Sequence, residues 1–312
     1  MISVAQALDL VLALGAPMPG ETVPLREAAG RMLAADVHAG RDQPPFPASA
    51  MDGYAIQQAD YVAGRKLRVL GEAAAGSGYA GAVTPGTCVR IFTGAPVPEG
   101  ATRVVIQEDV EAEDGGITLR ETSESGAHIR PAGADFTTGQ ALRAPFLLTP
   151  QHIALLASMN VAQVPVVRRP RVALISTGSE LVMPGENPGP DQIIASNTFG
   201  LHAMLNAAGA DAKILPIAHD NVPALKTAFN LARGADLIVT IGGASVGDHD
   251  LVGDVAAELG MKRAFYKIAM RPGKPLMAGQ LHGAAMVGLP GNPVSAMVCG
   301  VIFLRPLIRK ML

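Results

Sequence analysis

Apolar residues in the second half of the chain follow two alternating patterns, which predict buried strands separated by amphipathic helices. The expected strands are 172–176, 212–217, 237–241, 264–270 and 284–289, and helices are expected to begin near residues 196, 222, 251 and 293. The run at 237–241 is rich in β-branched residues, which is typical of a strand buried on both faces. This alternation predicts an α/β fold with a doubly wound, mainly parallel sheet, whose ligand crevice lies at the carboxyl ends of the strands.

The first half of the chain has a different pattern. Short strands are expected at 66–70, 88–92, 103–107 and 117–120, with glycine and proline between them. Helices are expected after Ser3, within 25–35, and after Thr149, where Pro150 takes the first helical position. We therefore predict a split linker domain of helices and strands at 1–40 and 140–170, a small inserted β domain at 41–139, and an α/β domain at 171–312.

The composition argues against several classes of protein. Hydrophobic residues make up 49% of the 312 residues, and the net charge of −2 provides no global positive field for nucleic acid. The two cysteines form no C-x-x-C pair, and the seven histidines show no H-E-x-x-H spacing. There is no signal-peptide pattern and no apolar run of membrane-spanning length, so we expect a cytoplasmic protein without a membrane or nucleic-acid partner.

A glycine-rich loop follows the strand at 237–241 and contains Gly242, Gly243 and Gly247. Strand, glycine loop and helix together aim backbone N–H groups at an anion, although a plain turn between strand and helix would show the same residues. The loop ends with Asp248 and Asp250, which could cap the next helix or could hold a Mg²⁺ ion that bridges to a phosphate. The loop is thus a candidate for a metal-linked phosphate site.

Three further stretches combine stiff backbone with polar groups. Arg271 and Lys274 project from a proline-stiffened loop that could attract an anion or could simply be a solvated basic turn. Asn292 is a good N-cap before Pro293, which explains that loop without any ligand. Asp52 stands in an Asp-Gly pair after a proline-rich segment, where a plain turn is the alternative to a precisely held carboxylate.

Together these motifs closely resemble one family, the molybdopterin molybdenumtransferases, also called MoeA-type proteins, which are related to gephyrin and to the E domains of plant Cnx proteins. The resemblance covers nearly the whole chain in the family's order. It rests on SAMDGYA at 49–55, FTGAPVPEGA at 92–101, PAGAD at 131–135, STGSEL at 176–181, IGGASVGDHD at 241–250, RPGKP at 271–275 and GLPGNPVSA at 288–296.

The resemblance implies a role in molybdenum cofactor biosynthesis. The family takes adenylylated molybdopterin and molybdate as substrates, releases AMP, and leaves molybdenum on the dithiolene, with Mg²⁺ as cofactor. It also implies a homodimer with an active site shared between subunits, and a molybdopterin adenylyltransferase and molybdoenzyme-maturation proteins as further partners. The family's small C-terminal β domain usually follows the last helix, and we expect it to be absent from this chain.

The resemblance also assigns site residues. The catalytic set is Asp52, Asp135, Lys267 and Asp250, and the metal ligands are Asp250, Asp220 and Glu180. The cofactor-binding set is Thr93, Gly242, Gly243, Ser245, Gly247, Arg271, Lys274, Pro275 and Pro290.

The chain departs from the family pattern at three of these motifs. Ala244 replaces a common valine, Ser179 a common aspartate and Arg271 a common lysine. Arginine in place of lysine keeps the charge but changes the geometry of the donors.

Three alternatives remain open at this point. A molybdopterin adenylyltransferase shares the α/β domain but has no need of the residues before 171. The chain could also be a scaffold, as gephyrin's E domain is, or a truncated relative that binds the pterin without turnover.

Overall fold

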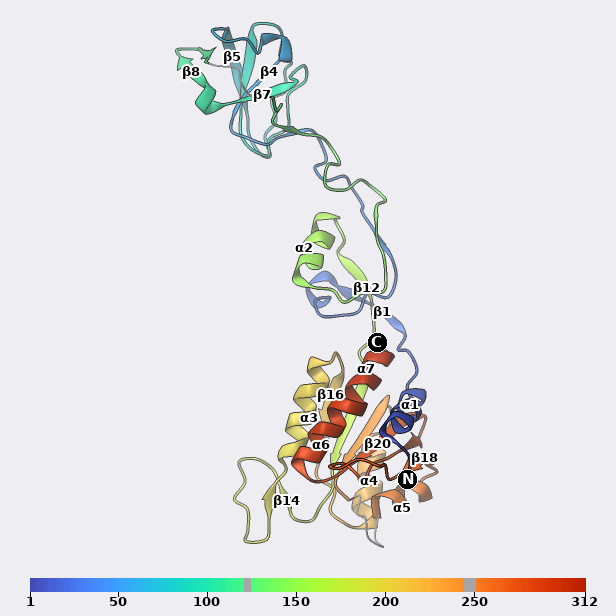
Figure 1. The fold of residues 1–312 in the computed structure, drawn as a ribbon. Helices are drawn as coiled ribbons and strands as arrows, with labels where there is room; N and C mark the ends of the chain where they lie inside the picture. The colour runs from blue at the N-terminus through green and yellow to red at the C-terminus, as the bar shows by residue number, and fades with distance from the viewer. Residues whose placement is uncertain (121–124, 244–250) are drawn as a thin grey trace. The chain divides into compact units, whose positions relative to one another are not determined.

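The computed structural model describes residues 1–120, 125–243 and 251–312, which form two compact units (Figure 1). The first unit contains residues 1–22, 30–34 and 165–312, and the second contains residues 23–29 and 35–164. Within the described residues, no helix is both long and apolar enough to cross a membrane.

The first unit is built on a six-stranded sheet whose first four strands are parallel. The order is β16 (Asp211–Ile214), β13 (Arg171–Ser176), β17 (Leu237–Ile241), β20 (Ala284–Leu289), β19 (Met277–Leu281) and β18 (Lys262–Tyr266). Strand β19 is antiparallel to β20, and β18 is antiparallel to β19. All five residues of β17 are buried, which confirms the predicted central strand.

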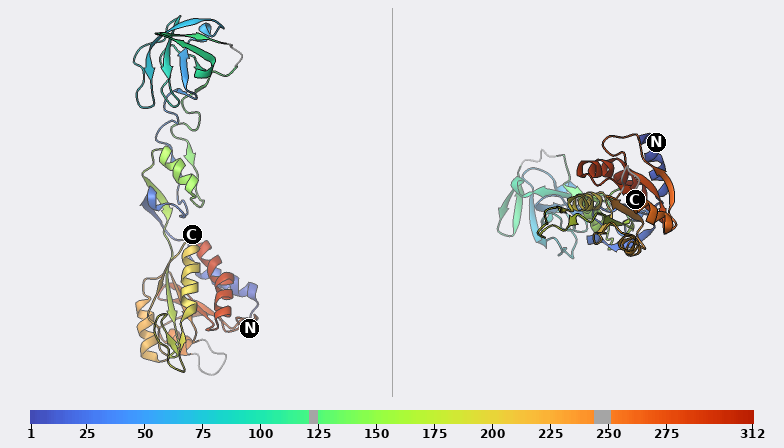
Figure 2. Two further views of the ribbon diagram at one scale, coloured as in Figure 1. Left: turned by 90° about the vertical axis from the view of Figure 1, so that its left-hand side faces the viewer. Right: turned by 90° about the horizontal axis from the view of Figure 1, so that it is seen from below.

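Helices cover both faces of this sheet, as the two views in Figure 2 show. In β17, Leu237, Val239 and Ile241 belong to one hydrophobic core, whereas Ile238 belongs to the other. This alternation confirms the doubly wound α/β fold. The first core is covered by α1 (Val4–Leu14), α3 (Ser196–Ala207), α6 (Pro293–Cys299), η4 (Gly300–Leu304) and α7 (Arg305–Met311), and the second by α4 (Val222–Leu231) and α5 (Leu251–Glu258).

Helix α1 begins as predicted and packs within the α/β unit. Ser3 accepts a hydrogen bond from the N–H of Gln6, and the Gln6 side chain accepts one from the N–H of Ser3, which completes a capping box. Ala7 and Val11 lie in the same core as Leu307 of α7. Residues 1–22 belong to the unit with the α/β sheet, whereas the linker domain predicted from the sequence contains residues 1–40 and 140–170. The division into three domains stays a prediction.

The second unit contains a six-stranded, mainly antiparallel sheet. Its order is β7 (Arg103–Ile106), β4 (Gly53–Ile56), β6 (Thr87–Ile91), β5 (Lys66–Ala73), β9 (Gly116–Leu119) and β8 (Val110–Glu113), with β5 and β6 parallel. The four strands predicted at 66–120 are therefore present, whereas β8 was not predicted from the sequence.

Short elements complete the chain. Helix α2 (Pro150–Ser158) begins after Thr149 as predicted. Two 3-10 turns in the second unit are η2 (Gln58–Asp60) and η3 (Gln107–Asp109). The remaining strands form two-stranded sheets: β1 (Gly20–Pro24) with β12 (Gln163–Val167), β2 (Val37–His38) with β11 (Ala141–Leu142), β3 (Ala48–Ser49) with β10 (Ile129–Arg130), and β14 (Leu181–Val182) with β15 (Ile193–Ile194).

Two expected elements differ from the structure. The helix expected within 25–35 is only a 3-10 turn, η1 (Leu25–Glu27). It is followed closely by Gly30, whose φ of +72° cannot continue a helix. The strand expected at 264–270 ends instead at Tyr266, because Lys267 has a φ of +66°, outside the extended region.

Candidate functional site

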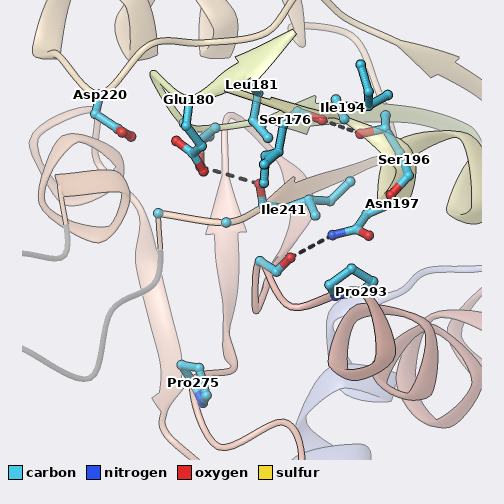
Figure 3. Close-up of a pocket in the computed structure, with 18 of the residues that line it drawn as sticks. Ser176, Glu180, Leu181, Ile194, Ser196, Asn197, Asp220, Ile241, Pro275 and Pro293 are labelled. Atoms are coloured by element: carbon cyan, nitrogen blue, oxygen red, sulfur yellow. Dashed lines mark hydrogen bonds between the residues drawn. The ribbon is translucent and has the colours of Figure 1, made fainter. Parts of the chain in front are cut away.

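A cavity of about 780 Å³ lies at the carboxyl ends of the parallel strands (Figure 3). From β13 the chain passes through α3 to β16 on one side, whereas β17 lies on the other side of β13. The chain therefore changes direction between β13 and β17, and doubly wound folds bind their ligands at such a switch point. The loops after β13, β17 and β20 and the first turn of α3 line the cavity.

Two glycines after β17 form part of the cavity wall, and neither could carry a side chain. Gly242 has a φ of +92°, and a Cβ there would lie 2.6 Å from the carbonyl oxygen of Thr177. Gly243 has a φ of +67°, and a Cβ there would lie 2.7 Å from the Thr177 hydroxyl. Gly242 and Gly243 therefore bring bare backbone to the cavity, which is what close approach to an anion requires. Their part in binding stays a prediction.

Two of the predicted metal ligands, Glu180 and Asp220, also line the cavity (Figure 3). The N–H of Ser179 donates to Asp220 Oδ2, and the N–H of Asp220 donates to Ser179 Oγ, both at 3.1 Å. This reciprocal pair fixes the Asp220 loop. Ser179, which replaces the family's common aspartate, thus has a structural role in holding this loop. Gly178 leaves room for the neighbouring Glu180 carboxylate, which a Cβ at Gly178 would meet.

The third predicted metal ligand, Asp250, lies outside the described residues, as do Ser245 and Gly247. Across residues 1–120, 125–243 and 251–312, no cluster of three or more His, Cys, Asp or Glu could hold a metal ion. The described part of the site therefore offers two carboxylates, Glu180 and Asp220.

Asn197, in the first turn of α3, was missed by the sequence analysis as a site residue. It lines the cavity, and its Nδ2 donates to the carbonyl oxygen of Gly291 at 2.7 Å (Figure 3). Gly291 follows the buried Pro290 and precedes Asn292, whose Oδ1 accepts from the N–H of Ser295 as the predicted N-cap. The only sign of this role in the sequence is the polar pair Ser196-Asn197 at the predicted start of the helix.

The loop with Arg271 and Lys274 is held tightly at its base. The N–H of Ile268 donates to the carbonyl oxygen of Lys274 at 3.1 Å, and that of Lys267 to Leu276 at 2.9 Å. Arg271 and Lys274 are exposed, and Lys267 is half-buried with its Nζ 4.8 Å from the centre of the Tyr266 ring. Among the described residues, none of the three cations forms a salt bridge.

These cations flank the cavity without forming its wall. Pro275 lines the cavity, whereas Lys267, Arg271, Lys274 and Pro290 are not among the described residues that do. Gly273 of this loop is buried and packs against Cys299, since a Cβ at Gly273 would lie 3.0 Å from Cys299 Sγ. Burial raises the pKa of the Cys299 thiol to about 12, so this thiol serves packing and not nucleophilic chemistry.

The remaining predicted residues lie in the second unit. The N–H and hydroxyl of Thr93 both donate to Asp52 Oδ1, at 2.8 and 2.7 Å. These two hydrogen bonds, the backbone one first, hold the pKa of Asp52 below its usual value. Asp135 is not joined to this pair by any hydrogen bond within the described residues, and it accepts a hydrogen bond from Arg130 at 2.6 Å.

Comparisons with known proteins identify the family of the chain. Residues 2–160 match the family model described as the MoeA N-terminal region (domain I and II), and residues 173–310 match the one described as a probable molybdopterin binding domain. The chain is 38% identical over 315 residues to a molybdopterin molybdenumtransferase of Haemophilus influenzae, covering 100% of this chain and 78% of that protein. It is 40% identical over 303 residues to molybdopterin molybdenumtransferase 2 of Mycobacterium tuberculosis, covering 92% and 74%.

Solved structures give the same result. Two crystal structures of a molybdopterin biosynthesis moeA protein from Pyrococcus horikoshii match with TM-scores of 0.84 and 0.81, at 31% and 28% identity. Each covers 100% of this chain, and 80% and 79% of the solved chain. Since both family models and relatives at these identities match along nearly its whole length, the chain belongs to the molybdopterin molybdenumtransferase family.

Proposed function

We propose that this chain inserts molybdate into adenylylated molybdopterin, releases AMP and leaves molybdenum bound to the dithiolene. The observation that carries the proposal is the cavity at the switch point of the sheet. There, bare backbone at Gly242 and Gly243 shares the cavity wall with two carboxylates, Glu180 and Asp220. Pro275 joins the wall to the loop of Arg271 and Lys274, two cations that form no salt bridge with the described residues. Backbone donors, acidic side chains and cations together suit a substrate that brings both a phosphate and an oxyanion.

The described residues fit a Mg²⁺ ion as the cofactor. Mg²⁺ is usually held by one or two carboxylates, with water and substrate phosphate completing its coordination. Glu180 and Asp220 are exposed carboxylates on the cavity wall, and they supply oxygen donors of this kind. Asp250 is proposed as the third ligand on the strength of the family resemblance. When bound, Mg²⁺ would neutralise charge on the adenylate phosphate.

The chain's own residues act by position and charge. Gly242 and Gly243 present their backbone to the phosphate, while Lys267, Arg271 and Lys274 attract molybdate. An oxygen of molybdate or of water attacks the adenylate phosphorus, the bond from that phosphorus to molybdopterin breaks, and AMP leaves with the attacking oxygen. Asp52, held by Thr93, and Asp135 are assigned to the same reaction on the family resemblance.

We propose a homodimer in which each active site combines Asp52, Thr93 and Asp135 of one copy with the cavity of the other copy. The support is that Asp52, Thr93 and Asp135 belong to one unit and the cavity belongs to the other. Mixing an Asp52→Asn chain with a Lys274→Ala chain should restore part of the activity, because some mixed dimers then contain one intact site. Mixing wild type with an inactive chain that carries both changes serves as the control. If the two single variants do not complement each other, the shared site is wrong.

The activity is tested by incubating the purified chain with adenylylated molybdopterin, molybdate and Mg²⁺ and measuring AMP. We expect AMP release that depends on molybdate, whereas ATP consumption with free molybdopterin would indicate an adenylyltransferase. Asp250→Asn should lower the rate on the order of 10²–10³-fold, because the amide keeps the shape but loses the charge. A variant rate within about twofold of wild type at saturating Mg²⁺ would show that Asp250 is misassigned.

Cytoplasmic location and contacts with the enzymes before and after this step belong to the same proposal. The substrate is made by a molybdopterin adenylyltransferase, and the product must pass to proteins that mature molybdoenzymes. Affinity capture from a cytoplasmic extract, with the Asp250→Asn chain as the substrate-retaining bait, should recover both classes. Recovery of neither would count against direct contact.

A further inference from the structure

Arg90 lies at the centre of a cluster on one face of the sheet in the second unit. It is on β6 and is the cross-strand partner of Tyr54 on β4. Phe92 follows two residues later, so its side chain points to the same face. The Arg90 guanidinium lies 5.0 Å from the centre of the Tyr54 ring and 4.8 Å from that of the Phe92 ring. Two aromatic contacts restrict the plane of this guanidinium.

The guanidinium is also hydrogen-bonded at two of its nitrogens. Nη1 donates to the carbonyl oxygen of Gly53 at 3.2 Å, and Nη2 donates to Gln107 Oε1 at 2.7 Å. These four groups lie on β4, directly after β6 and at the start of η3. A half-buried arginine with both ends engaged is a fixed part of the fold rather than a mobile surface cation.

Both of these hydrogen bonds lead directly to Asp52. Gly53 is the next residue along the chain, and the backbone N–H of Gln107 donates to the carbonyl oxygen of Asp52 at 3.1 Å. Arg90 therefore binds the backbone of Gly53 and the side chain of Gln107. Both residues adjoin Asp52, one along the chain and the other through a backbone hydrogen bond. The backbone of Gly53 also packs closely against β7, because a Cβ at Gly53 would overlap the backbone carbonyl of Val105.

We propose that Arg90 is a positioning residue that fixes the Asp52 carboxylate for reaction, acting through Gly53 and Gln107. This inference rests on the proposed function, in which Asp52 takes part in the release of AMP. Thr93 holds one carboxylate oxygen of Asp52, and Arg90 holds the carbonyl oxygen of the next residue, Gly53. Without Arg90, the aspartate keeps its charge but loses its fixed direction.

Lysine should not replace this arginine. The Arg90 guanidinium uses two N–H donors in one plane, and its flat faces contact the Tyr54 and Phe92 rings. A lysine ammonium is a point charge on a flexible chain and cannot do both. We expect Arg90→Lys to lower kcat for AMP release about tenfold and Arg90→Ala on the order of 10²-fold, since a small misplacement of a reacting group can cost that much. KM for adenylylated molybdopterin should stay within about twofold, because the effect is on orientation.

Arg103 provides a matched control in the same unit. Its guanidinium also stacks on a tyrosine, Tyr61, at 3.9 Å, and its Nε donates to Gln58 at 2.9 Å, but its described hydrogen bonds do not reach Asp52 or its neighbours. Arg103→Lys should change the melting temperature at least as much as Arg90→Lys while leaving kcat unchanged. Equal losses of kcat in the two variants would show that Arg90 has only a structural role.

Chemical rescue separates positioning from folding. Adding guanidinium ion to Arg90→Ala should restore part of kcat, because the planar ion fits between the Tyr54 and Phe92 rings, whereas methylammonium at the same concentration should not. Unchanged activity in Arg90→Ala, or equal rescue by both ions, would overturn the proposal.

Hydrogen exchange gives a measurement that does not depend on the activity. The backbone N–H groups of Thr93 and Gln107 both donate to Asp52, and that of Gly86 donates to Asp60 in the same unit as an internal reference. Arg90→Ala should speed exchange at Thr93 and Gln107 and leave Gly86 unchanged. If wild type releases no AMP, the proposed function fails, but faster exchange at those two amides would still support the positioning role. Unchanged exchange would refute it.

Discussion

The side chain of Asn197 and the backbone of Gly291 are joined by a hydrogen bond of 2.7 Å across 94 residues of sequence. The bond connects the start of α3 with the loop after β20, and both of these segments line the cavity. A Cβ at Gly291 would lie only 3.4 Å from Gly242 Cα, so the Gly291 loop also abuts the glycine loop. Movement of the Gly291 loop would therefore change the shape of the cavity on two sides.

Asn197→Ala should weaken ligand binding more than it weakens the fold. We expect about 1 kcal/mol of lost stability, and a loss of AMP affinity of about five- to tenfold, measured by titration calorimetry. The control is Asn206→Ala, at a residue of the same helix that does not line the cavity. It removes the 3.0 Å hydrogen bond that Asn206 accepts from the N–H of Ala212 on β16 and a contact with His202. Asn206→Ala should cost similar stability without a change in affinity. The same loss of affinity in both variants would contradict this role of Asn197.

Gly242→Ala should destabilise the α/β unit more than Gly260→Ala. Both glycines have nearly the same φ, +92° and +91°, which L side chains rarely adopt, so alanine is strained at both positions. A Cβ at Gly242 would lie 2.6 Å from the Thr177 carbonyl oxygen, whereas a Cβ at Gly260 meets nothing within 4 Å. We expect a loss of about 1 kcal/mol for Gly260→Ala and at least about 2 kcal/mol more for Gly242→Ala, measured by urea unfolding. Equal losses would mean that the Gly242 loop relaxes freely.

Asp236 should make the α/β unit sensitive to acid. Burial alone would raise the pKa of Asp236, but hydrogen bonds from Arg168 and from the N–H of Arg171 outweigh it and lower the pKa. A lowered folded-state pKa means that this carboxylate stabilises the fold above its unfolded-state pKa, and that this contribution is lost as the pH falls through the folded-state value. Asp236→Asn should therefore cost about 1–3 kcal/mol at pH 7 and less at pH 3, which lies below the unfolded-state pKa, measured by urea unfolding.

The control for Asp236 is Glu258→Gln, which breaks the surface ion pair with Lys226. Since exposed pairs contribute little, its cost should stay below about 1 kcal/mol at both pH values. A cost for Asp236→Asn that did not change between pH 7 and pH 3 would show that the charge of Asp236 is unimportant.

Thr93→Val should raise the pKa of Asp52 towards its ordinary value, because it removes the hydroxyl donor and leaves the backbone donor. If the reaction needs the Asp52 carboxylate, the acid limb of kcat against pH should move to higher pH. Carbon-detected NMR of the Asp52 carboxyl would follow the same change directly. The two titrations should shift in the same direction.

Thr138→Val is a close control for this variant. Asp42 accepts from the N–H and hydroxyl of Thr138 in the same way, both at 2.7 Å, and the pKa of Asp42 is also lowered. Its titration should shift while the acid limb of the activity does not. If both variants moved the activity profile equally, Asp52 would have no special part in it.

Local patterns in the sequence predicted much of the α/β unit. The central strand at 237–241, the caps at Ser3 and Asn292, and Gly242 and Gly243 on a cavity wall each depend on residues close together in the sequence. Short, weakly patterned segments such as β8 and β19 were missed, because their pairing with neighbouring strands decides their conformation.

What the sequence could not predict depends on contacts between distant segments. Asn197 has a part in the site only because sheet order places Gly291 beside it. Arg90 is an ordinary strand residue until β4 and η3 are placed around it. Lys267 ends a strand early through a backbone conformation that lysine rarely adopts, and no local pattern indicates it.

The shared core of α1 and α7 affects how the chain is made. Ala7 and Val11 need Leu307 and Met311 to be buried, so the first helix to leave the ribosome cannot complete its packing until residue 311 has emerged. Residues 35–164 of the second unit are all available long before then. The second unit can therefore fold during synthesis, while the apolar face of α1 stays exposed to solvent. Growing chains with such exposed apolar surface are prone to aggregate.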